Sequence, residues 1–511
     1  MTIKYIKTFG FLILLLFTST ISICQQDNQH KEGFVDVEIN STDQKVEPMT
    51  GIVFWQGQNT STDAISLEFS YMLYNDVVKK KGVYDWTIVE KKLNDIASRG
   101  HQAIFRFRVT YPGYRTSVPD YIKALPDYEE IKGKSEGEVT WFPDWRHKEL
   151  RRFTLEFYQK FAEKYDDDPR IAFLQVGFGL WGEYHIYDGV FILGRTFPSK
   201  NFQEEFFINL DNNFKALPWQ ISIDAADDTY SPFSIKPDLL KLKFGNFDDS
   251  FMHKDHSGYN EESWDYFKKG RRETSPAGGE FSYYTDYDQR HVLDLPNGPH
   301  GISYEDFAKK FNTTYMIGND QPGYQTMQRI KEASMASGYR FLVKSFKISP
   351  TQSKVVIKNV GVAPIYYDAY PTVNGVRSSK SLKHLLSGTS MEFIVESGGG
   401  SPVFTIECDR LVNGQTIGFL GTNSVSIASY KANISKVYPN IVTTGEQINI
   451  ETIYRGKKKV TLKIYNSTGM LVDNIKFSNK TTLQSDNLIG GVYFLHFSVD
   501  NMYQVSKLVV K

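Results

Sequence analysis

Between residues 47 and 338, short apolar runs alternate with stretches in which apolar residues recur every three or four positions. The amphipathic stretches predict helices, which span 88–99, 149–164 and 202–217. The apolar runs predict eight strands, which span 51–55, 65–71, 102–109, 171–177, 219–224, 242–247, 277–281 and 313–317. Eight strands of this kind, each followed by a helix or a loop, predict an α/β fold, a (β/α)₈ TIM barrel.

Beyond residue 338 the pattern changes to short strands separated by turns, without clear amphipathic helices. The segments 354–361 and 402–407 are typical strands, and Gly398–Gly400 and Asn413-Gly414 are typical turns. The pattern predicts a β-sandwich domain over 339–430.

The last part of the chain, 437–511, predicts a small all-β domain with an ordered set of motifs. It begins with Val437-Tyr-Pro-Asn440, has a Tyr-Asn-x-x-Gly turn at 465–469 and a Gly-Val-Tyr strand at 491–493, and ends in the apolar tail 507–511. This order resembles the C-terminal sorting domain of the type IX secretion system. The resemblance implies the type IX secretion machinery as a partner and export across both membranes of a Bacteroidota-type cell, with cleavage or surface attachment. The alternative is another sandwich domain at the C-terminus.

The N-terminus predicts a signal peptide over 1–24. Lys4 and Lys7 precede a short apolar run, 11–17, which is too short to span a membrane. A lipoprotein with Cys24 lipidated is the alternative to cleavage. The polar segment 25–46 predicts a flexible leader. No other apolar run reaches spanning length, so we expect no stable membrane span and a secreted or cell-surface protein that passes through the periplasm.

The charge, cysteine and aromatic content of the chain bear on its possible partners and on disulfide formation. The chain has 59 basic and 59 acidic residues and no net charge, so nothing indicates a nucleic-acid partner. If the signal peptide is cleaved after Cys24, only Cys408 remains, and no intrachain disulfide can form. Aromatic residues make up 14% of the chain, which suits both packed cores and carbohydrate-stacking surfaces.

The fourth and seventh predicted strands each lead to a glutamate. The fourth ends in glycines, which let the backbone bend sharply, and then in Trp181-Gly182-Glu183-Tyr184-His185. The seventh runs through Gly278-Gly279 into Glu280, and we expect these glycines to leave space for a sugar ring. Strand ends four and seven face each other across a barrel mouth, and glycoside hydrolysis needs two carboxyl groups flanking one bond. We therefore predict a glycoside hydrolase with a carbohydrate substrate, Glu183 as acid/base, Glu280 as nucleophile, and no metal or cofactor.

This arrangement resembles the clan of (β/α)₈ glycoside hydrolases with an acid/base Glu on strand four and a nucleophile Glu on strand seven. Tyr84-Asp85-Trp86 resembles a turn of its β-galactosidase-like branch. That clan usually has Asn before the acid/base residue, where this chain has Gly182. The segment 176–183 instead resembles the acid-bearing strand end of inverting β-amylases. Retention is favoured because of the strand four and seven placement, and inversion stays open. The barrel and sandwich together also resemble a domain pair of unknown function in secreted Bacteroidota proteins.

Further polar and aromatic residues near the predicted strand ends are candidates for binding substrate: Trp55, Arg106, Arg108, Trp181, His185, Asp224, Asp248, Asn319 and Asp320. Tyr71, Trp141, Trp145 and Trp264 are further candidates for stacking on sugar rings, and Asp227 and Asp228 for hydrogen bonds to sugar hydroxyls. Arg106 and Arg108 have a structural alternative, pairing with acidic residues such as Glu68 inside the barrel. Asp248, Asp249, His253 and His256 have a spacing too loose to predict a metal site.

Two other functions stay open. One is a non-catalytic carbohydrate-binding or adhesive surface protein on a glycosidase-like barrel. The other is a different barrel enzyme, such as a deacetylase or a lyase. The pair Glu183 and Glu280 favours the hydrolase over the binding protein, and the loose metal spacing disfavours the deacetylase.

Overall fold

The computed structural model describes residues 33–39, 41, 44–421, 430–431, 434–454, 458–467, 470–499 and 502–511. The predicted signal peptide with Cys24 and the leader residues 25–32 lie outside the described residues. None of the helices in the described part of the chain has both the length and the apolar character needed to cross a membrane.

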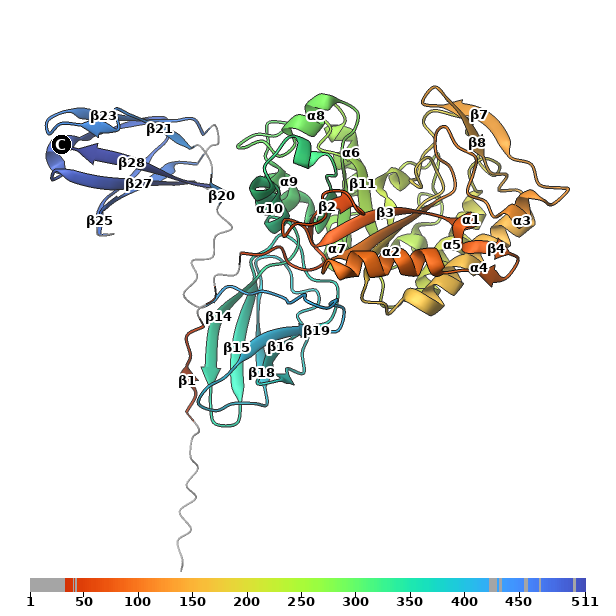
Figure 1. The fold of residues 1–511 in the computed structure, drawn as a ribbon, viewed down its shortest axis with the longest axis horizontal. Helices are drawn as coiled ribbons and strands as arrows, with labels where there is room; N and C mark the ends of the chain where they lie inside the picture. Colours follow the sequence, from red (N-terminus) through yellow and green to blue (C-terminus); the bar gives the residue numbers. More distant parts are fainter. Residues whose placement is uncertain are drawn as a thin grey trace, which may run out of the picture.

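Eight parallel strands close into a barrel, which confirms the predicted fold class (Figure 1). In order around the barrel they are β2 (Gly51–Trp55), β3 (Leu67–Leu73), β6 (Gln102–Arg108), β9 (Ile171–Val176), β10 (Trp219–Ser222), β11 (Gly245–Phe251), β12 (Ala277–Phe281) and β13 (Tyr315–Ile317). These strands are mostly buried on both faces, as expected of a parallel sheet covered by helices.

Helices cover the barrel, and the three longest of them each bury an apolar stripe. In α4, the predicted stripe of Leu150, Phe153, Phe157 and Phe161 is buried. The helices are α1 (Tyr74–Val77), α2 (Thr87–Ser98), α3 (Asp120–Lys123), α4 (Lys148–Tyr165), α5 (Lys200–Asn213), α6 (Ser257–Tyr266), α7 (Lys269–Thr274), α8 (Asp286–His291), α9 (Tyr304–Phe311) and α10 (Met327–Met335). Short 3₁₀ turns are η1 (Ile223–Ala226), η2 (Pro237–Lys241), η3 (Gln321–Gly323) and η4 (Ser485–Asn487).

Two segments of the barrel differ from the prediction. The sixth strand is displaced toward the C-terminus, because polar residues at 248–250 belong to β11 and hide it from an apolar pattern. The predicted loop 111–147 contains α3 and a hairpin of β7 (Ile131–Ser135) and β8 (Glu138–Phe142). Another small hairpin, β4 (Val78–Lys80) with β5 (Val83–Tyr84), precedes α2.

Two antiparallel sheets follow the barrel where a β-sandwich is predicted. One comprises β1 (Val35–Asp36), β14 (Phe341–Ile348), β15 (Ser353–Asn359) and β18 (Ser390–Val395). The other comprises β16 (Ala369–Val373), β17 (Val376–Arg377) and β19 (Phe404–Cys408). Their apolar residues share a core with barrel residues. The Tyr367 hydroxyl donates to the Ala172 carbonyl at 2.5 Å, and Arg410 donates to that of Ile171 at 3.1 Å. Both acceptors lie at the start of β9, so these sheets contact the end of the barrel opposite the strand C-termini.

The C-terminal region is all-β, as predicted. One of its sheets contains β20 (Tyr430–Lys431), β22 (Ile441–Val442), β24 (Val460–Asn466), β25 (Leu471–Phe477), β27 (Gly491–Val499) and β28 (Met502–Val510). The other contains β21 (Ser435–Tyr438), β23 (Gln447–Thr452) and β26 (Lys480–Gln484). Alternate residues of β27 are buried in a core of their own, separate from the barrel core.

Candidate active site

The loop after β9 folds back on itself and fixes the position of Glu183. The backbone N–H groups of Phe178 and Gly179 both donate to the Glu183 carbonyl, at 3.0 and 2.8 Å. A Cβ atom at Gly177 would lie 2.2 Å from the Gly182 carbonyl oxygen, and one at Gly179 would lie 2.0 Å from that of His185. Glycine is therefore required at both positions. The predicted bend is confirmed, and Glu183 is 4% exposed.

Glu280 lies near the C-terminal end of β12. The two glycines before it do not open space for a sugar ring, contrary to the prediction. A Cβ atom at Gly278 would lie 2.2 Å from the ring of Tyr315, and one at Gly279 would lie 2.1 Å from the Asp248 carbonyl oxygen. The glycines thus make room for a buried tyrosine and for the neighbouring strand.

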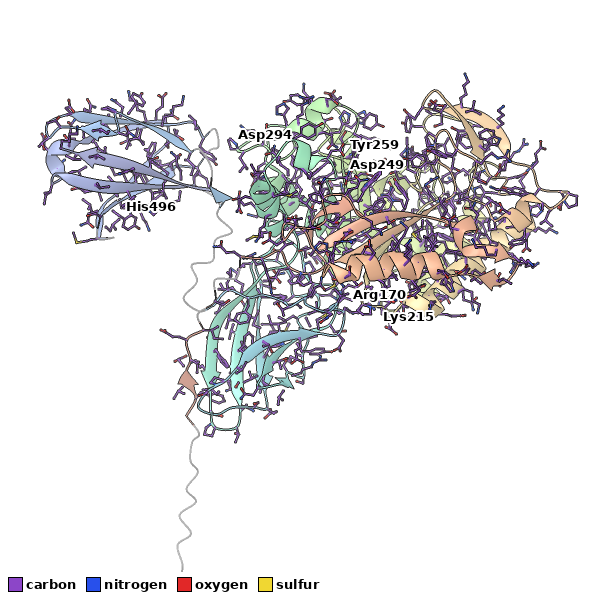
Figure 2. The ribbon with its side chains drawn as sticks, in the orientation of Figure 1. Arg170, Lys215, Asp249, Tyr259, Asp294 and His496 are labelled. Atoms are coloured by element: carbon purple, nitrogen blue, oxygen red, sulfur yellow. The ribbon has the colours of Figure 1, made fainter. Side chains whose placement is uncertain are left out.

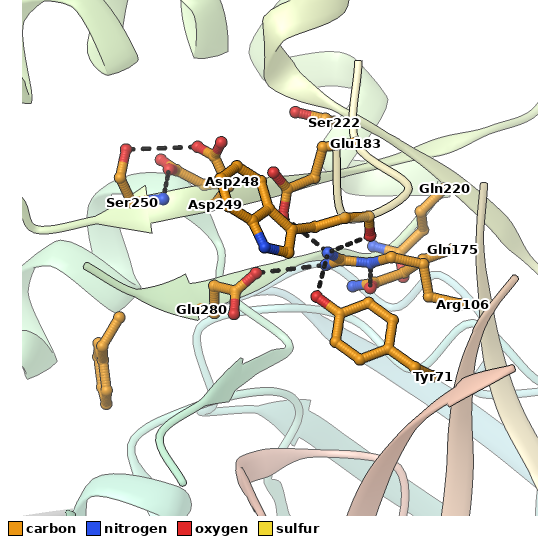
Figure 3. Close-up of polar contacts among 12 residues, drawn as sticks. Tyr71, Arg106, Gln175, Glu183, Gln220, Ser222, Asp248, Asp249, Ser250 and Glu280 are labelled. Carbon is orange, nitrogen blue, oxygen red and sulfur yellow. Dashed lines mark hydrogen bonds and ion pairs between the residues drawn. The ribbon is translucent and has the colours of Figure 1, made fainter. Parts of the chain in front are cut away.

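Arg106 joins the two glutamates from β6 (Figure 3). Its side chain is fully buried, and its two terminal nitrogens lie 2.8 Å from Glu183 Oε1 and 3.5 Å from Glu280 Oε1. Its Nε donates to Gln175 at 2.7 Å. The guanidinium also lies over the ring of Phe247, 4.5 Å from its centroid. Both carboxyl groups therefore contact one guanidinium, which burial and these contacts hold in place.

Burial dominates the electrostatics of the pair. It raises the pKa of Glu183 well above its usual range, and Asp249 adds to the rise, while Arg106 opposes it. Burial also raises the pKa of Glu280, which Arg106 and a hydrogen bond with the Glu183 carboxyl group oppose. The charge of Glu280 also raises the pKa of Glu183, because two neighbouring carboxyl groups do not both ionise readily. A carboxyl group that keeps its proton can serve as a general acid.

His185 is held beside Glu183 by a second set of carboxylates. Its Nδ1 lies 2.5 Å from Asp224 Oδ2 and 3.6 Å from Asp249 Oδ2, and its Nε2 lies 3.8 Å from Glu183 Oε2. Burial lowers the pKa of His185, but these carboxylates outweigh it and raise the pKa to about 10. Burial raises the pKa of Asp224, and the His185 charge outweighs that effect and lowers it. Burial and Asp224 raise the pKa of Asp249 to about 7.

A cavity of about 430 Å³ opens above these groups. Its walls are aromatic and its floor carries the carboxyl groups. The lining residues are Trp55, Tyr71, Tyr111, Glu136, Trp181, Glu183, His185, Tyr187, Asp249, Glu280, Tyr283 and Tyr284, and all belong to the barrel region. Of the predicted residues, the structure thus brings Glu183, Glu280, Trp55, Tyr71, Trp181 and His185 to one cavity. Figure 2 labels Asp249, which lines the cavity, and Tyr259, which belongs to α6.

Three predicted residues act next to the cavity instead of lining it. Arg106 lies beneath the glutamates, and Asp224 orients His185. Arg108 stacks on Tyr111, 4.2 Å from the ring centroid. In the structural alternative, Arg106 and Arg108 pair with acidic residues such as Glu68. Glu68 instead bonds to Arg99 and His101.

Asp248, Asn319 and Asp320 do not line the cavity. Side chains alternate along a strand, so Asp248 points away from the barrel axis while Asp249 points into the cavity. Asp248 accepts hydrogen bonds from Trp264 Nε1 at 2.9 Å and Asn260 at 3.0 Å. Asn319 accepts from the Trp55 backbone at 3.0 Å and also bonds to the exposed Asp320 at 3.3 Å.

Several other candidates have structural roles. Trp145 and Trp264 are buried, and Trp141 contacts Arg115 and Lys132. Asp227 accepts from the Thr229 backbone, and Lys200 bonds to the Asp228 carbonyl. His253 stacks on His256, with ring centroids 4.0 Å apart.

The sequence interpretation missed part of the cavity wall. Tyr283 and Tyr284 come three and four residues after Glu280 along the chain, and this proximity could have indicated that they lie near the site. Glu136 comes from the tip of the β7–β8 hairpin and bonds to Tyr187. Nothing in the local sequence of the hairpin indicates that it reaches the cavity.

Comparison with known proteins supports the C-terminal assignment. Residues 436–511 match the family described as Secretion system C-terminal sorting domain. The match confirms the predicted type IX sorting domain and indicates that the protein is exported to the cell surface or the medium by that machinery.

No curated protein matches the chain in sequence. Among solved structures, the chain is similar to the galactosidase domain of the α-galactosidase–sucrose kinase AgaSK, with TM-score 0.32 and 10% identity, over 69% of this chain and 55% of that one. It is similar to CbXyn10B, with TM-score 0.32 and 10% identity, over 50% and 77%. It is also similar to the GH36 α-galactosidase AgaA from Geobacillus stearothermophilus, with TM-score 0.29 and 11% identity, over 70% and 57%. The chain therefore spans about half the length of the first and third of these proteins.

Proposed function

We propose that the barrel hydrolyses a glycosidic bond of a polysaccharide or oligosaccharide, with Glu183 as acid/base and Glu280 as nucleophile. The observation that carries the proposal is the contact of both carboxyl groups with the Arg106 guanidinium at the floor of one aromatic cavity. Glycoside hydrolysis needs two carboxyl groups that flank one bond, and this contact holds the two at one place. Aromatic walls such as Trp55 and Trp181 offer faces on which sugar rings stack.

The roles follow from the environments of the two groups. Burial raises the pKa of Glu183 further than Arg106 lowers it, so this group carries a proton that it can donate to the leaving oxygen. Arg106 and the Glu183 proton both stabilise the carboxylate form of Glu280, which then attacks the anomeric carbon. We favour retention because the two glutamates follow the fourth and seventh strands of the barrel; a carboxyl separation of about 5–5.5 Å would fit retention, and one of about 6.5–9.5 Å would fit inversion.

The rest of the chain would deliver this barrel outside the cell. We propose passage through the periplasm after removal of residues 1–24, and cleavage or surface attachment at the sorting domain. The boundaries 47–338, 339–430 and 437–511 belong to the same proposal. The sheets of the middle region contact the end of the barrel away from the cavity, so we assign them no catalytic group.

A glycan screen tests the proposal. The exported protein would be incubated with a panel of plant and algal polysaccharides, and new reducing ends would be measured. Glu280→Gln should lose nearly all activity, while Glu163→Gln, at an exposed residue of α4, should match the wild type. Activity that persists in Glu280→Gln would refute the assigned nucleophile. Glycan binding without hydrolysis by the wild type would favour the non-catalytic carbohydrate-binding alternative.

A further inference from the structure

Three side chains with metal-ligating atoms converge at one side of the cavity. Glu183, His185 and Asp249 each offer one such atom, and these atoms all lie within 4.8 Å of one another. Glu183 and His185 come from the loop after β9, and Asp249 comes from β11. Two donors therefore come from a loop held by its own backbone hydrogen bonds and one from a barrel strand, which together form a preorganised set.

The orientation of His185 is the second observation. Its Nδ1 is committed to Asp224 at 2.5 Å, which leaves Nε2 as the ring atom that can bind a ligand. His185 is only 9% exposed, and its Nε2 makes no hydrogen bond to any residue in the described part of the chain. A histidine that bonds to a carboxylate through one nitrogen and presents the other to a site is typical of metal coordination. Asp224 is itself held by the Ser222 hydroxyl at 2.9 Å.

Glu183 and Asp249 each have a carboxylate oxygen close to His185. Arg106 contacts Oε1 of Glu183, so Oε2 faces His185. The Ser250 hydroxyl donates to Oδ1 of Asp249, and Oδ2 of Asp249 lies 3.6 Å from Nδ1 of His185. With Asp224, three carboxyl groups therefore surround one imidazole. A divalent cation bound here would compensate the negative charge of these carboxylates, which a proton on His185 also does.

We propose that Glu183 Oε2, His185 Nε2 and a carboxylate oxygen of Asp249 bind a divalent transition-metal cation. One imidazole and two carboxylates suit Zn²⁺, which binds in open sites through three protein ligands and leaves a fourth position for water or substrate. The inference goes beyond the proposed hydrolysis. A cation on Glu183 Oε2 takes the place of the proton that the general acid donates, so cation binding switches the acid off.

Calorimetric titration of Zn²⁺ into the full chain, without an affinity tag, tests the site directly. The wild type should bind one equivalent at this site. His185→Gln and Asp249→Asn should each remove that binding. Asp224→Asn keeps all three ligands but loosens the orientation of the histidine, and it should weaken binding about 10–100-fold.

Two control variants distinguish Zn²⁺ binding at these three ligands from Zn²⁺ binding elsewhere on the protein. Glu280→Gln removes the proposed nucleophile but no cation ligand, so it should bind Zn²⁺ within about threefold of the wild type while losing hydrolysis. His256→Gln removes the exposed member of the His253–His256 stack and should leave the binding unchanged. Circular dichroism would confirm that each variant folds, and Asp249→Asn provides a second test should His185→Gln fail to fold.

Clear results would overturn the inference. One is the absence of saturable binding by the wild type. Another is binding that survives both His185→Gln and Asp249→Asn. A third is binding that is lost only in His256→Gln. The titration needs no substrate, so a negative glycan screen would leave the cation site standing, and absent Zn²⁺ binding would leave the hydrolase proposal standing.

Discussion

Removal of the buried Arg106 charge should destabilise the barrel strongly and in a pH-dependent manner. Arg106→Met keeps a side chain of similar length and removes the cation that contacts Glu183 and Glu280. Removing one partner of a buried ion pair costs about 3–5 kcal/mol, because the remaining charge is left without compensation. For a domain of this size, each kcal/mol lowers the melting temperature by roughly 2–4 °C. We therefore expect the barrel transition to fall by about 6–20 °C at pH 8.

The sign of the pH dependence follows from the two carboxyl groups. Their pKa values in the folded protein are raised above the ordinary range, so the folded state binds more protons than the unfolded state, and stability falls as pH rises through this interval. Loss of Arg106 raises both pKa values further and steepens that fall. The difference between variant and wild type should thus be larger at pH 8 than at pH 5.

Differential scanning calorimetry at the two pH values measures the effect. Arg290→Met is the matched control, because Arg290 forms an exposed ion pair with Asp286 and its loss should cost less than about 1 kcal/mol. An Arg106→Met protein as stable as this control, with no pH dependence, would refute the picture of two carboxyl groups held by one buried cation.

Four further predictions concern the loop, the acid and export. Gly179→Ala should lower stability by about 1–3 kcal/mol in urea unfolding, because its Cβ would overlap the His185 carbonyl, whereas Gly258→Ala has open space and should not. Glu183→Gln should reduce turnover by about 10²–10⁴-fold on natural glycans and much less on aryl glycosides whose leaving group needs no proton; equal losses on both would contradict an acid role. The ratio kcat/KM of the wild type should fall as pH rises through the Glu183 pKa, and Glu183→Gln should lack this alkaline limb. Deletion of 437–511 should leave the barrel folded in the periplasm, and a truncated protein found in the medium would disprove the sorting role.

The sequence was sufficient for the barrel and for the two glutamates because each has a local signal. Buried parallel strands are continuous apolar runs, and the loop at 177–183 requires glycine for steric reasons that operate within a few residues. The C-terminal motifs are also local and ordered, and the family match confirmed them.

The remaining errors come from contacts that are distant along the chain. Which of Asp248 and Asp249 faces the cavity depends on the pleat of β11, and the sequence shows only adjacent aspartates. The roles of Gly278 and Gly279 depend on Tyr315 and on a neighbouring strand. Glu136 reaches the cavity only because its hairpin lies near Tyr187, which is 51 residues away.

The anomeric configuration of the first product tests the central claim most directly. Once the screen has identified a substrate, proton NMR during the first minutes of hydrolysis distinguishes the α and β reducing ends before they interconvert. The two-glutamate account predicts a product with the configuration of the substrate, and no product from Glu280→Gln. An inverted product, or undiminished hydrolysis by Glu280→Gln, would contradict the assignment of Glu280 as the nucleophile.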